Sequence, residues 1–390
     1  MVHLAPHPLK LIDVGDDEPF VAEALRPRKP YEVCWCGSGR KYKKCHRFRE
    51  EEAPLAKGQM LHANDQVFWQ RRACMHPLAS PNVCQGQVID AHTIQRKGPL
   101  QQIVSPSNHV CVFRAAEGAA VVEEISWKRA STFPGYCSLH DSRTFGPIER
   151  IAFSGSHEQC VLQTYRNVCN ELYKKRALID SMKYQRTVID RGRDLHNQIE
   201  LQMSIAQNIA GQTKSMQELS DVLHAFHDAI AHGDYGRFSS KCYFFEGDLC
   251  VTSAAALHTE FDFQGRQLAD MWDLSIDAEM LAHSVMATDC GGAIVFTWKN
   301  EDSAPAAITS SFDAVPDEQK GDIFVQYCFL NSENTFFSKV WWDGLPLTLQ
   351  NRIRQYAGSL YYEGGAFVAN DPPLVNWTFV RPPDISGQHR

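Results

Sequence analysis

The 390-residue sequence lacks the features of a membrane-spanning or exported protein. No stretch approaches the roughly 20 consecutive apolar residues that a membrane-spanning helix needs. The first 20 residues lack the apolar core and the cleavage site of a signal peptide. We therefore expect a cytoplasmic protein without membrane insertion.

An overall excess of positive charge is also absent. The net charge is -7, with 39 Lys and Arg against 46 Asp and Glu. Any contact with nucleic acid must therefore come from a local basic patch. Hydrophobic content of 44% and charged content of 22% are those of a globular protein, and no internal repeat or low-complexity tract interrupts it. The length allows two or three domains, each with its own core.

Cysteine is plentiful, but the odd count of 13 excludes a fully paired set of disulfides. In a reducing compartment we interpret clustered thiols as metal ligands and scattered thiols as small core residues. Six cysteines belong to two clusters in the first 140 residues. The scattered ones are Cys111, Cys160, Cys169, Cys242, Cys250, Cys290 and Cys328.

Proline is missing between Pro147 and Pro305, and the chain in this gap begins with a helical pattern. Apolar residues recur at steps of three and four over residues 157–233, which predicts a pair or trio of long amphipathic helices. We expect breaks near three glycines, Gly192, Gly211 and Gly233.

Short apolar runs bounded by turn residues predict strands on both sides of the helical region. They are QVIDAHTI, HVCVF and AAVVEEISW before it, and CYFFEGDLCVTS, GGAIVFTW, DIFVQYCFL and KVWW after it. One further helix is expected over 347–361. The sequence thus predicts an α+β multidomain fold. The expected segments are a flexible arm (1–30), a small zinc module (31–52), a treble-clef or ββα-like zinc domain (60–150), a helical region (157–235) and an α+β domain (241–382).

Residues 34–46, CWCGSGRKYKKCH, hold three thiols and one imidazole. Zinc prefers four such ligands at tetrahedral corners. Gly37 and Gly39 let the backbone reverse between the ligands, because glycine takes positive φ freely. We expect the last two ligands at the start of the next short helical turn. The predicted zinc ligands are Cys34, Cys36, Cys45 and His46.

This stretch resembles the SEC-C motif, a small zinc module at the C-terminus of the SecA preprotein translocase and on many other bacterial proteins. The four ligands match it, as do the turn and basic residues Gly37, Ser38, Gly39, Lys41, Tyr42 and Lys44. The resemblance covers residues 31–49 and implies an accessory module that docks a partner. Nine Lys or Arg and one acid lie between Arg26 and Arg49, so the module can attract phosphates or an acidic protein surface. The alternative is a solvated face without a partner.

A second cluster of ligand types lies between residues 74 and 141. One pair of possible ligands, Cys74 and Cys84, precedes a predicted β-hairpin that carries a histidine, and a second pair, Cys137 and His140, follows it. A treble-clef zinc site needs two such knuckle-like pairs in this order. The predicted ligands are Cys74, Cys84, Cys137 and His140, with His76 as a substitute for either of the first two.

Residues 70–150 are also similar, in order and type, to zinc-knuckle HNH endonucleases, which have a ββα-metal core. The resemblance implies that His92 is the general base, Asn108 braces the loop, and Asp141 or His140 binds a catalytic Mg²⁺ or Mn²⁺. If His140 holds structural zinc, only Asp141 is left for the catalytic ion.

Two features depart from the HNH pattern. Ala91 stands where a metal-binding residue usually precedes the base, and Asp90 lies on the other face of the strand unless a bulge intervenes. The gap of 28 residues between Asn108 and Cys137 is also long. The run from Ala91 to Glu149 is similar to a block in other bacterial proteins, some bearing SEC-C motifs, and this likeness implies no activity.

Other patterns are weaker. His224, His227 and Asp228 share one helix face with metal-compatible spacing, although histidines at a helix end are favoured by the helix dipole alone. Trp341 and Trp342 can stack on bases or peptide, or divide between core and surface of a strand.

Two functions fit these patterns. The first is an HNH-like, metal-dependent endonuclease recruited by the zinc module, and it leads because His92 with Asn108 between two knuckles is more than a scaffold requires. The second is a non-catalytic zinc adaptor that binds a protein partner or nucleic acid through residues 31–49, with the long helices available for homodimer formation. A C-terminal domain with a different enzymatic activity is a third alternative, and no motif names its reaction.

Overall fold

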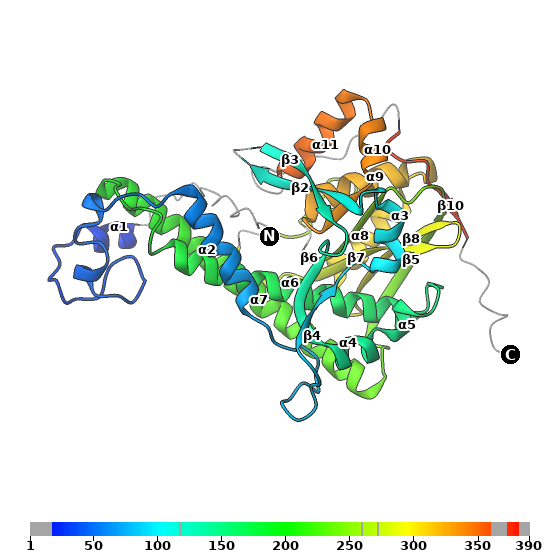
Figure 1. Cartoon of the computed structure of the whole chain (residues 1–390), viewed down its shortest axis with the longest axis horizontal. Coiled ribbons are helices and arrows are strands. Elements are labelled where there is room, and N and C mark those ends of the chain that lie inside the picture. The colour runs from blue at the N-terminus through cyan, green and yellow to red at the C-terminus, as the bar shows by residue number, and fades with distance from the viewer. Residues whose placement is uncertain (1–17, 117–118, 259, 271–272, 360–372, 382–390) are drawn as a thin grey trace. The chain divides into compact units, whose positions relative to one another are not determined.

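Figure 1 shows the structure, a computed structural model that describes residues 18–116, 119–258, 260–270, 273–359 and 373–381. It is a mixture of helices and sheets, as the α+β prediction requires. Its contacts define two compact units. The smaller unit comprises Met1–Arg71 and Lys174–Gln217, and the larger unit comprises Arg72–Tyr173 and Glu218–Arg390. Within the described chain, no helix combines the length and the apolar character needed to cross a membrane.

The smaller unit is built from short helical segments that precede two long helices. The short segments are α1 (Glu18–Leu25), η1 (Tyr42–Lys44), η2 (Arg49–Glu51) and α2 (Lys57–Gln70). The long helices are α6 (His157–Gln185) and α7 (Leu195–His232), and each contributes residues to both units. The sequence predicted a flexible arm over 1–30, but Glu18–Leu25 is helical and buries Ala24 against Trp35. The rest of that arm up to residue 17 lies outside the described residues.

The two long helices confirm most of the helical pattern. Gly192 lies in the bend between α6 and α7 with φ of 72°, and a Cβ there would lie 3.0 Å from the carbonyl oxygen of Glu52. Gly233, which follows α7, has φ of 65°. The predicted break at Gly211 is wrong, because α7 continues through it. One internal glycine costs about 1 kcal/mol relative to alanine, which a long packed helix tolerates.

The larger unit contains an antiparallel sheet of eight strands (Figure 1). In spatial order they are β10 (Thr378–Val380), β5 (Phe238–Glu246), β8 (Gly291–Lys299), β7 (Met280–Thr288), β6 (Val251–His258), β9 (Thr335–Phe337), β2 (His109–Ala116) and β3 (Ala119–Ser126). The hairpin β2–β3 joins the C-terminal strands because β9 pairs with both β6 and β2. Strands expected in two separate segments therefore form one sheet.

Both faces of this sheet are covered, and strand β7 shows the consequence. On one face, Asn167 of α6 donates a hydrogen bond to the Ser284 hydroxyl at 2.9 Å, and Met286 packs near Cys160. On the other face, Val285 belongs to the main core with Phe324. A strand that is buried on both sides loses its polar–apolar alternation. This explains why sequence patterning did not predict β7.

The core on the second face includes four C-terminal helices. They are α8 (Ser303–Asp313), α9 (Asp317–Asn331), α10 (Lys339–Gly344) and α11 (Leu347–Ser359). The strand predictions for DIFVQYCFL and KVWW are wrong, because these runs lie in α9 and α10. The C-terminal half of α9 is buried on all sides from Phe324 to Phe329, so its mostly apolar run has no clear polar face, and such a run does not distinguish helix from strand.

A separate two-stranded sheet carries the second cysteine cluster. Strands β1 (Val88–His92) and β4 (Thr132–Cys137) pair in antiparallel fashion. The chain between them includes η3 (Arg96–Leu100), α3 (Gln101–Ile103) and the β2–β3 hairpin, and β4 leads into α4 (Ser138–Thr144) and α5 (Gly146–Glu149).

Buried His283 of β7 makes the stability of the larger unit depend on pH. Its ring bonds to the Ser253 hydroxyl at 2.9 Å, and burial lowers the pKa of His283 to about 3. An unfolded histidine titrates near 6.5, so below that pH the unfolded state binds more protons. The stabilising contribution of neutral His283 is present above pH 6.5 and is lost as the pH falls towards 3.

We expect His283→Gln to flatten this acid dependence. Between pH 6.5 and 5, the free energy of unfolding of the wild type should fall by about 2 kcal/mol more than that of the variant. This figure follows because one proton bound only by the unfolded state costs about 1.4 kcal/mol of stability per pH unit. Denaturant unfolding at several pH values measures the difference. His232→Gln, at an exposed position at the end of α7, should follow the wild type. Parallel curves for His283→Gln and wild type would contradict the assignment.

Candidate metal centres

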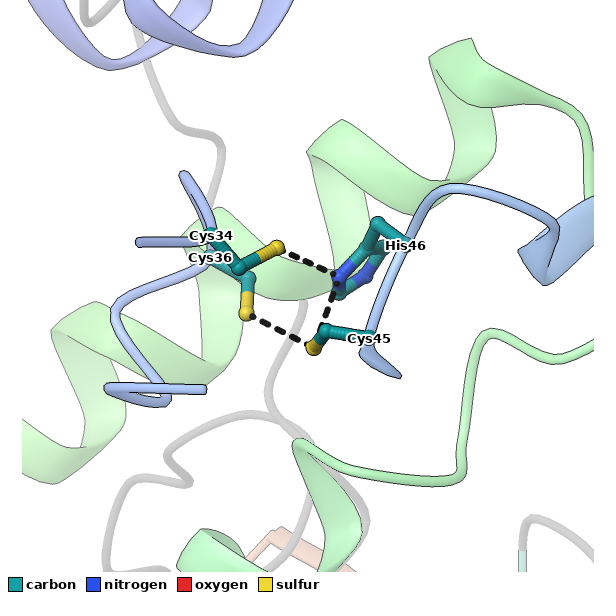
Figure 2. A group of neighbouring side chains, drawn as sticks. All are labelled: Cys34, Cys36, Cys45 and His46. Carbon is teal, nitrogen blue, oxygen red and sulfur yellow. Dashed lines mark hydrogen bonds between the residues drawn. The ribbon is translucent and has the colours of Figure 1, made fainter. Parts of the chain in front are cut away.

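The first ligand group lies in the smaller unit and is shown in Figure 2. Its four members are buried and converge at one point: Cys34, Cys36, Cys45 and His46. The Nδ1 atom of His46 lies 3.2 Å from the Sγ atoms of both Cys34 and Cys45, and Cys36 lies 3.6 Å from Cys45. All four candidate donor atoms lie within 4.8 Å of one another.

The turn between the ligands has the predicted backbone. Gly37 and Gly39 have φ of 73° and 70°, which confirms that the reversal uses left-handed glycines. The Cys34 N–H donates to the carbonyl of Arg40 at 2.8 Å and closes the loop. The position of the last two ligands differs from the prediction. Cys45 and His46 follow the 3₁₀ turn η1 instead of starting a helical turn.

A buried carboxylate holds the far side of the His46 ring. The Nε2 atom of His46 lies 2.6 Å from Oδ2 of Asp190, and both side chains are almost fully buried. Burial lowers the pKa of His46, but hydrogen bonds to Asp190 and to the thiols outweigh it and raise the pKa to about 11. Hydrogen bonds to Cys34 and Cys45 lower the pKa of the Cys36 thiol. The group therefore favours negative charge on sulfur beside a positive charge.

These residues fit a tetrahedral zinc ion. Three thiols and one imidazole are a complete structural ligand set, and thiolates buried together need a cation to balance their charge. The Nδ1 atom of His46 faces the sulfurs, whereas Nε2 is engaged by Asp190. Bound zinc would cross-link the ends of the loop and supply no reaction of its own in such a closed site.

The second ligand group lies in the larger unit and consists of the predicted residues Cys74, Cys84, Cys137 and His140. The Nδ1 atom of His140 lies 3.3 Å from Cys74, 3.7 Å from Cys84 and 3.3 Å from Cys137. The predicted substitute ligand, His76, stacks on the His140 ring with 4.1 Å between centroids. Its ring therefore covers one face of the His140 ring.

Secondary structure explains why these four residues meet. Cys137 ends β4 and caps α4, and His140 lies in the first turn of that helix. Burial raises the pKa of the Cys137 thiol, but backbone hydrogen bonds from His140 and Gln85 help to lower it overall. A strand pair that leads into a helix whose start supplies two ligands resembles the predicted treble-clef arrangement, but β1 and β4 are separated in the chain by η3, α3, β2 and β3 and do not form the expected hairpin.

His92 ends β1, as predicted, but it belongs to neither ligand group. Burial is the main cause that lowers the pKa of His92 to about 4, and a hydrogen bond from the His92 ring to the backbone carbonyl of Trp127 opposes it. A register shift between Ile89 and Ala91 marks the bulge considered from the sequence. Asp90 in that bulge is exposed and pairs with Arg72 at 2.8 Å.

Asp141 lies one residue beyond the ligand His140 and faces a buried arginine. The guanidinium of Arg166 lies 3.8 Å from Asp141 and 2.7 Å from Glu149, and it covers the ring of Phe145 at 3.9 Å. Burial raises the pKa of Asp141, and Arg166 partly offsets it. The guanidinium of Arg166 therefore already places a positive charge beside Asp141, the carboxylate that the HNH resemblance gives as a ligand of the catalytic ion. Spacing gave no indication of Arg166, which lies on α6.

Asn108 lies in an exposed turn before β2 with φ of 60°. Its carbonyl accepts a hydrogen bond from the Trp127 N–H at 3.1 Å, so its backbone braces the turn after β3. His92 and Asn108 both contact the backbone of Trp127. The catalytic roles of His92, Asn108 and Asp141 stay predictions.

Among the weaker candidates, His227 bonds to the carbonyl of Met75 at 3.0 Å, and the two described metal-ligand groups do not include it. Trp342 is buried and its neighbour Trp341 donates to the carbonyl of Leu374 at 2.7 Å, so this pair packs the core. Of the scattered cysteines, Cys290 is exposed and Cys242 half-buried, and the other five are buried.

A cavity of about 1010 Å³ opens in the larger unit. Its lining includes Lys97 of η3, Glu149 of α5 and Asp289 of the β7–β8 turn. The predicted catalytic residues are not among the residues that line it.

Comparison with known families gives one match. Residues 32–47 match the family model of the SEC-C motif. The SEC-C motif contains all four ligands of the first centre, which confirms the resemblance and, with the second ligand group, supports a zinc-binding protein. No curated protein and no solved structure matches the chain. Sequence reasoning missed Asp190, because it lies 144 residues from His46 and no motif links them.

We expect about two zinc ions per chain, one for each ligand group. Cys34→Ser should remove the zinc of the SEC-C centre, and Cys137→Ser should remove the other. Elemental analysis of the purified full chain measures the loss. Cys290→Ser changes an exposed, non-ligand thiol and should retain both ions. A wild-type chain with less than one zinc, or an unchanged content in Cys34→Ser, would disprove the ligand assignment.

Proposed function

We propose that the protein is a non-catalytic zinc adaptor whose SEC-C motif docks an acidic protein partner. The observation that carries this proposal is a cluster of exposed cations around the first zinc centre. They are Arg40, Lys41, Lys43, Lys44 and Arg47, here called the docking cations. In the described structure, no carboxylate pairs with any of them, whereas Arg26, Arg28 and Arg49 of the same segment are ion-paired.

Exposed apolar side chains accompany the docking cations. Tyr31, Val33 and Phe48 are 67%, 59% and 52% exposed. The Lys43 ammonium lies 3.9 Å from the Tyr31 ring centroid, and the Arg47 guanidinium lies 4.9 Å from that of Phe48. A surface that mixes unpaired cations with apolar groups suits a partner segment of carboxylates and apolar side chains. Lys43 covers a face of Tyr31, which disfavours base stacking there and favours protein over nucleic acid.

The closed ligand sets also favour an adaptor. Each centre uses four protein donors, which is the pattern of structural zinc, whereas a catalytic zinc keeps a position open for water or substrate. In this proposal the first zinc holds the docking surface in shape, and the second stabilises the β1–β4 strand pair of the larger unit.

Charge reversal tests the docking surface. We expect the double variant Lys41→Glu, Lys43→Glu to lower partner capture at least tenfold, while it keeps two zinc ions, because neither side chain is a ligand. Capture from cell extract by the full chain, quantified by mass spectrometry, measures the change.

The matched control is Lys183→Glu with Arg193→Glu, which reverses two exposed cations elsewhere in the smaller unit. It should capture the same partner as the wild type. Equal loss in both double variants would indicate a nonspecific charge effect and contradict the docking surface. A captured fraction that disappears after nuclease treatment would indicate nucleic acid instead.

A metal-dependent nuclease is the second candidate, and the order of β1, β4 and α4 favours it. His92 ends the first strand of this arrangement, and burial keeps its ring neutral at pH 7 because its pKa lies near 4. A neutral imidazole can accept a proton from water, but a pKa this far below 7 makes His92 a weak base. Against this role, the guanidinium of Arg166 already accompanies the carboxylate of Asp141.

A plasmid-nicking assay with added Mg²⁺ or Mn²⁺ separates the two candidates. The adaptor proposal predicts no nicking above a protein-free control, and the same result for His92→Ala. Nicking by the wild type that is lost in His92→Ala, at unchanged zinc content, would replace the adaptor with the nuclease. Nicking that persists in His92→Ala would point to a contaminant.

A further inference from the structure

The environment of the SEC-C centre extends beyond its four ligands to the bend between α6 and α7. Asp190 lies in this bend and is completely buried. Its Oδ2 atom lies 2.6 Å from Nε2 of His46 and 2.7 Å from the Nε2 amide of Gln202. Its Oδ1 atom forms an ion pair with Arg49 at 3.2 Å. The carboxylate is therefore held on three sides in one orientation.

We infer that Asp190 is the positioning residue of the SEC-C zinc centre, holding His46 so that Nδ1 is the metal donor. A ligating histidine has one nitrogen for the metal and one for an orienting partner, and a carboxylate partner also makes the ring a better donor. The ring is confined in addition by Trp35, with 4.5 Å between centroids. The inference rests on zinc binding by the four ligands and not on the docking of a partner.

Further contacts attach the bend to the loop that carries the ligands. Arg49 donates to the carbonyl of Thr187 at 3.0 Å, and its own carbonyl accepts from Gly192 at 2.9 Å. Ile199 of α7 packs in the same cluster as Trp35 and the three ligand cysteines. The SEC-C motif is therefore part of the core of the smaller unit, and its zinc affinity depends on residues about 140 positions downstream.

The second zinc centre provides an internal reference. Its histidine also turns Nδ1 towards three thiols, but the structure places the ring of His76 against it rather than a carboxylate. A change at Asp190 should therefore affect one zinc ion and leave the other. This selectivity separates a positioning role from a general loss of folding.

The test compares the full chain with Asp190→Asn under competition with a zinc chelator. The substitution keeps the size of the side chain and removes its charge. Loss of a carboxylate that orients a ligating histidine typically costs about 10- to 100-fold in metal affinity. We expect a drop of that size for one of the two zinc ions. Combining the substitution with Cys137→Ser, which leaves only the SEC-C centre, should show the whole drop.

Asp194→Asn is the matched control, because Asp194 is an exposed carboxylate in the same bend and bonds to the N–H of Asn197 at 3.0 Å. It should bind both zinc ions like the wild type. Gln202→Leu removes one of the bonds that hold Asp190 and should give a smaller loss at the same centre. Because Gln202→Leu leaves Asp190 in place, it tests the same positioning role if Asp190→Asn does not fold.

Ring nitrogen signals give a readout that a purely structural role would not change. In ¹⁵N spectra of the zinc-loaded wild type, His46 should bind metal through Nδ1 and carry a slowly exchanging proton on Nε2. In Asp190→Asn, exchange of that proton should accelerate while zinc is still bound. Wild-type zinc affinity in Asp190→Asn, or coordination of His46 through Nε2, would overturn the inference.

Discussion

Thiols buried around one point need a cation to balance the charge that their ionised forms carry, and both ligand groups of this chain are organised by that requirement. In each group three cysteines surround the Nδ1 atom of one histidine. The ligands come from a glycine turn and the residues after a 3₁₀ turn in one group, and from a loop, a strand end and the first turn of a helix in the other.

The two centres differ in what supports the histidine. At the SEC-C centre a buried carboxylate from the α6–α7 bend engages the free ring nitrogen of His46. At the second centre the ring of His76 stacks on His140. A carboxylate increases the electron density on the ligand, whereas a stacked ring shields it from solvent. The same ligand set can therefore bind zinc with different strength in the two places.

Helices α6 and α7 explain why this difference is built into the fold. The first part of α6 and the last part of α7 belong to the larger unit, and the end of α6 and the start of α7 belong to the smaller one. Asn167 of α6 bonds to the sheet through Ser284, while Asp190 after the same helix bonds to the candidate zinc ligand His46. A single pair of helices thus contributes polar side chains to the interiors of both units.

Local sequence patterns were sufficient where the physics is local. The two groups of four candidate zinc ligands, the left-handed glycines of the first turn and the two long helices follow from spacing, from the freedom of glycine and from a 3.6-residue period. Patterns failed where burial is complete, because a segment covered on all sides has no polar face to set a period. Strand β7 and helix α9 are the examples. What only the tertiary structure decided is the pairing of distant polar groups, Asp190 with His46 and Arg166 with Asp141. Each pairing depends on how α6 and the bend after it pack, and no rule of spacing connects residues that are brought together only by the fold.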